Sequence, residues 1–312
     1  MIVSASRRTD LPAFFSEWFC RRLEAGEMLL PNPVNPRQVS HVRLDAGAVD
    51  AFVFWSKNPG PLLQRFDRIE RTGIPVLFHY TITDCPPELE PGVPPRKDRI
   101  ALFRELARRL SPEQAVWRFD PLIFTPQLER RRHLREFRMI AGELAGSTRR
   151  VVVSFLDFYR KIRTELAAFG VRDPSLEEKC ETAVELAEAA AAAGLEFRLC
   201  AEPEVAAATG LSASGCIDPA LLERITGRRI LVGKDPGQRP ACGCALSVDI
   251  GSYHCCRHRC RYCYANRSTE LKFLHDPDSP LLLGRPEPGM RISERRMEPA
   301  FGEPLPDGAG RV

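Results

Sequence analysis

The stretch PVLFHYTI, residues 75–82, decides the fold class, because apolar residues occupy both of its faces. A strand with one face in water alternates apolar and polar residues, whereas a strand of a parallel sheet is covered on both faces and is apolar along its length. Similar short runs occur at residues 1–6, 50–55, 115–119, 150–156 and 196–200, with a further candidate at 230–232. These runs predict a parallel sheet.

Helix-like segments separate the runs, at residues 12–25, 62–71, 96–110, 127–144 and 175–193. In the last segment, Ser175 and Glu178 form a capping box and Gly194 follows the end. No G-x-G-x-x-G motif follows any of the runs, so a dinucleotide-binding sheet would lack its phosphate turn. We therefore predict an α/β fold of the TIM-like (β/α) barrel type, complete or partial, with six to eight strands and right-handed crossovers.

The pattern changes after Gly233. We expect residues 1–240 to form the barrel and residues 241–270 to form a cysteine-rich iron–sulfur segment packed on the barrel mouth. Residues 271–312 are rich in proline, glycine and arginine and lack periodicity, so we expect a poorly ordered tail there.

The composition is that of a soluble globular protein, with 44% hydrophobic and 28% charged residues among 312. A net charge of +4 is too small to indicate nucleic-acid binding by itself. No apolar run approaches the roughly 20 residues of a membrane helix, and the N-terminus lacks the pattern of a signal peptide. We expect a cytoplasmic protein without a membrane partner.

Polar residues follow six of the predicted strands, where a β/α barrel places its active site. A capping or ion-pair role is an alternative for each of them, but their recurrence at six strand ends favours a common site. The candidate catalytic residues are Arg7, Arg8, Asp10, Lys57, Asn58, Asp120 and Glu202.

The chain has eleven cysteines, most of them in its last third, which favours metal binding over disulfides in a cytoplasmic protein. Cys256, Cys260 and Cys263 have the spacing C-x3-C-x2-C. Three thiolates can hold a [4Fe–4S] cluster and leave its fourth iron without a protein ligand. With His254 or His258 as a fourth ligand, the same cysteines would instead hold zinc.

A second group, Cys200, Cys216, Cys242 and Cys244, is a candidate for a second cluster or a zinc ion. Both sulfurs of the C-x-C pair at 242 and 244 can reach one metal. The alternative is that Cys200 and Cys216 are small buried apolar residues, as we expect for Cys180 on the helix at 175–193.

The pattern of Cys256, Cys260, Tyr262 and Cys263 resembles the cluster motif of radical S-adenosylmethionine enzymes. That resemblance implies a partial or full β/α barrel and a cofactor-binding role for these four residues. It also implies S-adenosylmethionine on the open iron, a 5′-deoxyadenosyl radical, and an electron donor such as flavodoxin or ferredoxin. In most of that superfamily the motif follows the first strand, whereas here it lies near residue 260.

A longer resemblance runs along the chain to about residue 267. The motifs SASRRTDLPAF, FWSKNP, WRFDP, SFLDFY, CAEPE and CGC, then SVDIGSYHCCRHRCRYCYAN, are similar to those of the domain-of-unknown-function 1848 family. Both cysteine groups fall in motif positions, but the family implies no reaction.

The sequence thus predicts an iron–sulfur protein, a radical S-adenosylmethionine-type enzyme with a small-molecule or macromolecular substrate. One alternative is a zinc- or cluster-stapled protein that binds nucleic acid through the basic stretch HCCRHRCR. Another is a barrel hydrolase that uses Asp10, Asp120 and Glu202, with a structural metal.

Overall fold

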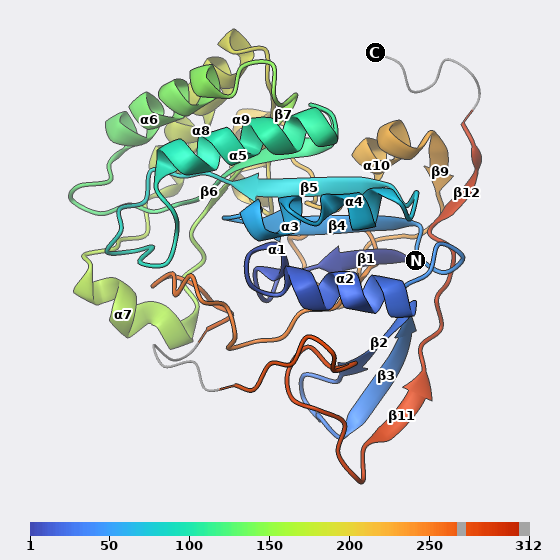
Figure 1. Ribbon diagram of the computed structural model, residues 1–312. Helices are drawn as coiled ribbons and strands as arrows, with labels where there is room; N and C mark the ends of the chain where they lie inside the picture. The colour runs from blue at the N-terminus through green and yellow to red at the C-terminus, as the bar shows by residue number, and fades with distance from the viewer. Residues whose placement is uncertain (267–272, 306–312) are drawn as a thin grey trace.

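The computed structural model describes residues 1–266 and 273–305, and its centre is a seven-stranded sheet (Figure 1). All neighbouring strands of this sheet are parallel. In spatial order the strands are β10 (Val248–Asp249), β1 (Ile2–Ala5), β4 (Ala51–Ser56), β5 (Val76–Thr81), β6 (Ala115–Leu122), β7 (Arg150–Phe155) and β8 (Glu196–Leu199).

From β1 to β8 the strands of this sheet lie side by side in chain order. Right-handed crossovers between neighbours that always advance in one direction run over the same face of a sheet. We call this the outer face. The helices whose side chains join its core are α1 (Leu11–Phe14), α2 (Ser16–Ala25), α3 (Gly60–Leu63), α4 (Phe66–Glu70), α5 (Arg96–Arg109), α6 (Arg130–Glu143) and α8 (Leu176–Ala192).

Alternate strand residues point to the opposite, inner face, because successive side chains of a strand project to opposite sides. Val53, Leu77 and Val116 belong to this second core. No large crossover helix covers them. Leu221 and Leu222 of the short helix α10 (Pro219–Thr226) pack there, together with Cys200, Cys216, Cys242 and Cys244.

The predicted α/β class is confirmed, and the sheet has seven parallel strands. A complete barrel does not form in the described residues, because no strand pairs with the outer side of β8 or of β10. On that side β8 has an isolated bridge between Leu199 and Ala213. The candidate strand at 230–232 appears as β9 (Arg228–Ile230), which pairs with β12 (Phe301–Pro304) outside the main sheet. The seventh strand is instead β10, whose two residues are too few to give a periodic signal.

A three-stranded sheet lies beside the main one (Figure 1). It consists of β2 (Glu27–Pro31), β3 (Gln38–Arg43) and β11 (Arg291–Glu294). The proline-rich stretch PNPVNP, residues 31–36, is the connection between the antiparallel strands β2 and β3. The remaining helices are η1 (Arg160–Ile162), α7 (Arg163–Ala168) and α9 (Pro203–Thr209). Of these, α9 also joins the outer-face core, through Val205.

Residues 273–305 form an extended arm on the main body, whereas the sequence predicted a poorly ordered tail over 271–312. Leu281, Leu282 and Phe301 are buried, and β11 and β12 pair with strands of the N-terminal and middle parts of the chain. An arm whose short strands find their partners elsewhere shows no periodicity of its own. The parts of the predicted tail at 271–272 and 306–312 lie outside the described residues. None of the described helices is long and apolar enough to cross a membrane.

Candidate metal centres

Residues 250–266, which carry the C-x3-C-x2-C motif, follow β10 and lie at the carboxyl ends of the first strands. Asp249 anchors this segment, since it accepts hydrogen bonds from Ser4 Oγ at 2.8 Å and Ser6 Oγ at 2.7 Å. A Cβ atom on Gly251 would lie 1.9 Å from Ser6 Oγ, so only glycine permits this close approach. The Tyr264 hydroxyl donates to the Arg7 carbonyl at 2.8 Å. The cysteine segment is therefore fixed to the end of β1.

Asp10 joins the same segment to β4. Its carboxylate accepts hydrogen bonds from Ser56 Oγ and the Lys57 amide, each at 2.8 Å, and contacts His258 Nε2 at 2.7 Å. The other ring nitrogen of His258, Nδ1, contacts the Gly92 carbonyl at 2.9 Å. Both nitrogens of His258 are therefore engaged with oxygen atoms, which does not support the alternative that His258 completes a zinc site.

A buried ion pair lies beside the motif. Lys57 Nζ donates to Glu90 Oε1 at 2.8 Å, and the Tyr262 hydroxyl donates to the same oxygen. Burial alone would raise the pKa of Glu90, but the positive charge of Lys57 holds that pKa below its ordinary value. Glu90 and Tyr262 are only 3% and 7% exposed. The pair therefore connects the end of β4 and the loop at 84–95 to the aromatic residue of the motif.

Cys256, Cys260 and Cys263 lie on one tight loop, close enough that charges on Cys263 and Cys256 act on Cys260. The Cys263 amide donates to the Cys260 carbonyl at 3.0 Å, and Arg259 has a left-handed φ of 55°. Burial raises the pKa of all three thiols. The Ala265 amide donates to Cys263 Sγ at 3.4 Å, a contact that would stabilise a thiolate ligand.

The second cysteine group lies on the inner face of the sheet. Cys200 Sγ is 3.3 Å from Cys216 Sγ, and Cys242 and Cys244 pack in the same buried cluster. Arg118 Nη1 donates to Cys216 Sγ at 2.8 Å. Contacts with Cys200 and Cys244, together with the Arg118 charge, lower the pKa of Cys216. The structure thus brings together all four cysteines of the second predicted group.

Neither group already surrounds a single ion. Within residues 1–266 and 273–305, no three or more histidine, cysteine, aspartate or glutamate side chains are arranged to hold one metal ion. Binding a metal in either group would therefore require the thiol side chains to turn between staggered rotamers.

The remaining predicted residues fall into two sets, of which the first surrounds the end of β1. Arg7 pairs with Asp249 and Asp235, each at 3.5 Å, and its Nη2 donates to Ser247 Oγ at 3.1 Å. Arg7 Nη1 is buried without a hydrogen-bond partner. Arg8 donates to the Gly251 carbonyl at 3.3 Å. Arg7 Nη1 is thus a free donor on a guanidinium that lies beside Asp235, Ser247 and Asp249.

The second set has local partners. The Asn58 side chain accepts a hydrogen bond from the Gly60 amide at 3.2 Å, which is a turn-forming role. Asp120 pairs with Arg118 through both carboxylate oxygens and accepts a hydrogen bond from Ser154 Oγ at 3.1 Å. Asp120 therefore acts on the second cysteine group through Arg118.

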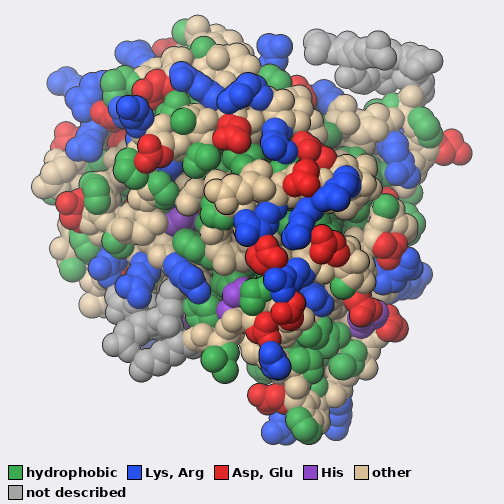
Figure 2. All heavy atoms as spheres, viewed as in Figure 1, with side chains coloured by type: hydrophobic (Ala, Val, Ile, Leu, Met, Phe, Trp, Pro, Cys, Tyr) green, Lys and Arg blue, Asp and Glu red, His purple; other side chains and the backbone are tan. Residues whose placement is uncertain are grey.

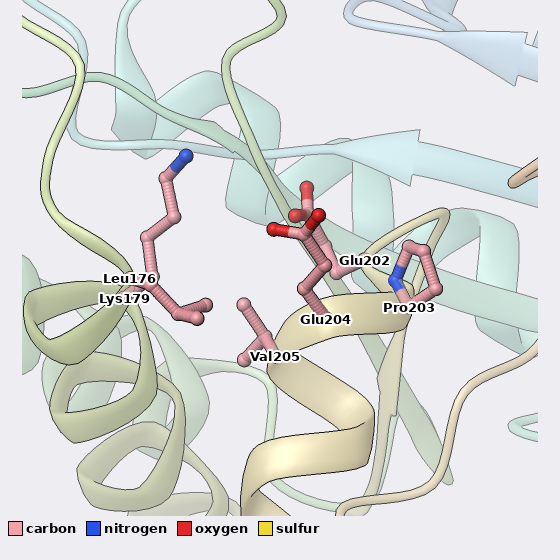
Figure 3. Close-up of a pocket in the computed structure, with 6 residues that line it drawn as sticks. All are labelled: Leu176, Lys179, Glu202, Pro203, Glu204 and Val205. Carbon is pink, nitrogen blue, oxygen red and sulfur yellow. The ribbon is translucent and has the colours of Figure 1, made fainter.

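Glu202 lies two residues after Cys200 and lines a pocket of about 280 Å³. Figure 3 shows it with Glu204 at the start of α9, and Lys179 reaching from α8. Glu202 Oε1 accepts a hydrogen bond from the Phe155 amide at 2.8 Å. Burial raises the pKa of Glu202 to about 7.

We expect Glu202→Gln to be more stable than the wild type at pH 8, by about 1–2 kcal/mol after allowance for solvent at the pocket mouth. Because the pKa of Glu202 is higher in the folded state, the folded chain binds the proton more tightly than the unfolded chain. The wild type therefore loses stability as pH rises from about 5 through 7. Urea unfolding at pH 5 and pH 8 measures this difference. The exposed neighbour Glu204→Gln is the control, and equal curves for wild type and Glu202→Gln at both pH values would refute the prediction.

Sequence reasoning missed Glu90, Arg118 and Asp249 as residues that shape these centres. Glu90 lies in a loop with five prolines between residues 84 and 95, where no periodic pattern marks a buried position. Arg118 was recognised as a strand-end residue but was not connected with the cysteines. The signal that would have helped is the pair of motifs S-G-C at 214–216 and C-G-C at 242–244, because glycine beside cysteine permits two backbones to approach closely.

A family model described as "Domain of unknown function (DUF1848)" matches residues 2–265. The match spans the seven-stranded sheet and both cysteine groups. No curated protein matches the chain.

Proposed function

This chain belongs to the DUF1848 family, and from that premise we propose that it is an iron–sulfur enzyme of the radical S-adenosylmethionine type. Cys256, Cys260 and Cys263 would hold a [4Fe–4S] cluster. One observation carries the proposal: the three neighbouring thiols lie on one loop over the strand ends, while His258 is engaged by Asp10 and Gly92. Such a set supplies three ligands to a cluster and leaves one iron for a small molecule.

The surroundings of the three thiols suit a thiolate-bound cluster. Burial and the negative charge of Glu90 raise the pKa of Cys260, and the positive charge of Lys57 acts against them. The amide of Ala265 donates to Cys263 Sγ. Positive charge and N–H donors offset the negative charge that three thiolates bring into a buried loop. Tyr262 packs beside the motif and holds Glu90.

When bound, the cluster would supply the electron that cleaves the sulfonium of S-adenosylmethionine. The chain's own residues would position and shield the reactants. Arg7 has a buried Nη1 without a partner, and a guanidinium is suited to bind a carboxylate of S-adenosylmethionine or of the substrate. The Asp10–His258 and Lys57–Glu90 contacts would hold the loop against the strand ends and exclude water. The electron would come from a donor such as flavodoxin or ferredoxin.

The two alternative functions have less support. Of the three carboxylates expected of a hydrolase, Asp10 and Asp120 are engaged by hydrogen bonds and an ion pair. Glu202 lines a pocket without either of the other two and accepts a hydrogen bond from the Phe155 amide. For nucleic-acid binding, Arg257 and Arg259 are exposed. On the face in Figure 2, however, acidic and basic side chains are interspersed rather than gathered into one basic surface.

We expect the wild-type chain, reconstituted anaerobically with iron and sulfide, to bind about four of each at the motif. Cys260→Ala should lose most of this iron and sulfide, because two thiolates do not hold the cluster. With dithionite and S-adenosylmethionine, only the wild type should release 5′-deoxyadenosine. Cys180→Ala, a cysteine on α8 outside both groups, is the matched control. Equal iron, sulfide and 5′-deoxyadenosine from wild type and Cys260→Ala would refute the proposal.

A further inference from the structure

We propose that Cys200, Cys216, Cys242 and Cys244 form a separate, closed metal site that holds one tetrahedral thiophilic ion, Zn²⁺ by preference. All four cysteines are buried, with exposed fractions of 8% or less. The Sγ atoms of Cys200 and Cys216 lie 3.3 Å apart, the Ile217 amide donates to Cys244 Sγ at 3.5 Å, and all four cysteines pack in one buried cluster. Four cysteine ligands are the ordinary set of a structural zinc site, which keeps no position open for a substrate.

Two glycines bring the cysteine-bearing loops together. A Cβ atom on Gly215 would lie 2.4 Å from the Gly243 carbonyl carbon and 2.5 Å from the Cys244 amide nitrogen. These are backbone atoms, which have no rotamer with which to move aside. The close approach brings the residues around Cys216 against Cys244. The Ile217 amide donates to Cys244 Sγ at 3.5 Å, although the two residues are 27 positions apart in the sequence. The loops are therefore built around the sulfurs.

Positive charge is available for the thiolates. Arg118, only 6% exposed, donates to Cys216 Sγ at 2.8 Å and is held in position by Asp120. Four thiolates and one divalent ion leave a net charge of −2, which is costly to bury without a neighbouring cation. Arg118 is also paired with Asp120, and its Nη1 donates to Cys216 Sγ, an N–H donor that would stabilise a thiolate ligand there.

The spacing of the sulfurs favours a single ion. A tetrahedral ion with metal–sulfur distances of about 2.3 Å holds its sulfurs about 3.8 Å apart. The observed Cys200–Cys216 separation of 3.3 Å is close to that value and much longer than the roughly 2 Å of a disulfide. A four-iron cube needs its cysteines spread around a larger body. Turning the thiol side chains to other staggered rotamers would open the centre for one ion.

The site would join the two free edges of the sheet. Cys200 directly follows β8, and Cys244 lies four residues before β10, and these two strands are the edges of the open sheet. Hydrogen bonds do not pair β8 with β10. One ion bound by cysteines from both sides would connect these edges across the inner face. We infer that the metal replaces the missing strand pairing of a closed barrel.

The test uses the full-length chain with Cys256, Cys260 and Cys263 all changed to serine, which removes the other proposed site. Purified from zinc-supplemented medium, it should contain about one zinc per chain and no acid-labile sulfide. Adding Cys216→Ser should remove the zinc, whereas adding Cys180→Ser should not. Zinc retained after Cys216→Ser, iron with stoichiometric sulfide, or a Cys200–Cys216 disulfide would each overturn the proposal.

A measurement on the wild type guards against variants that fail to fold. Iodoacetamide should modify Cys200, Cys216, Cys242 and Cys244 slowly until a zinc chelator is added, and peptide mapping reads each site separately. Equal modification with and without chelator would overturn the proposal. These outcomes are independent of the iron site, since loss of 5′-deoxyadenosine formation with intact zinc would refute only the proposed function.

Discussion

Lys57→Met is expected to lower the free energy of unfolding by about 3–5 kcal/mol, because it leaves the Glu90 carboxylate buried without its cation. Among the described residues, no second cation donates a hydrogen bond to Glu90 that could replace the one from Lys57. Oε1 accepts from Lys57, Tyr262 and Thr83, and Oε2 is buried without a partner. Methionine keeps most of the volume of the lysine side chain, so the loss reports charge rather than packing. Equilibrium unfolding in guanidinium chloride measures it.

The double variant Lys57→Met/Glu90→Gln is the control that separates charge from structure. Replacing both partners removes the buried charge, so the double variant should recover most of the stability lost by Lys57→Met. The iron content of the reconstituted chain should follow the same order, since Tyr262 depends on Glu90 for its hydrogen bond. A double variant as unstable as Lys57→Met would show that the ion pair does not carry the effect.

Two glycine substitutions should damage the two cysteine groups separately. Gly215→Ala forces a Cβ atom to within 2.4–2.5 Å of backbone atoms in the 242–244 loop, and Gly92→Ala forces one to within 2.6–2.8 Å of backbone atoms at 257–258. Each should cost about 3 kcal/mol of stability. Gly215→Ala should lose zinc and keep iron, and Gly92→Ala should do the reverse.

Gly233→Ala is the matched control, because no heavy atom lies within 4 Å of its Cβ position. It should change stability by less than about 0.5 kcal/mol and leave both metals bound. Metal analysis and thermal unfolding of the three variants side by side make the comparison. If Gly215→Ala and Gly92→Ala lost the same metal, the assignment of two independent centres would be wrong.

The sequence was informative where many consecutive residues share one environment. The runs at β1, β4, β5 and β7 are buried on both faces, so each shows a continuous apolar signal, and the α/β class followed from them. The strand β10 has two residues and depends on β1 for its pairing, so nothing local marks it. The arm at 273–305 was missed for the same reason, because its strands β11 and β12 are stabilised by partners far away in the chain.

The candidate residues show a similar division. Cysteine spacing predicted that Cys256, Cys260 and Cys263 act together, and the four cysteines of the second candidate group pack in one buried cluster. The metal-binding role of both groups stays a prediction. The individual role of each strand-end residue was not predictable, because it depends on which loop lies opposite. Asp10 contacts His258, which is 248 residues later in the chain, whereas Asp120 is paired with Arg118, which is two residues before it. Sequence alone identified both as polar strand ends and gave no means to distinguish them.

The pairing of β1 with β10 has a consequence for synthesis on the ribosome. Val3 of β1 pairs with Val248 of β10, and β1 is synthesised long before β10. This side of β1 therefore stays unpaired until β10 has left the ribosome. Until then the nascent sheet presents an open edge, which is a template for aggregation. Because the cysteine segments also emerge late, the proposed metals would bind only after most of the sheet exists. Chaperone binding to the nascent chain would be most valuable during this interval.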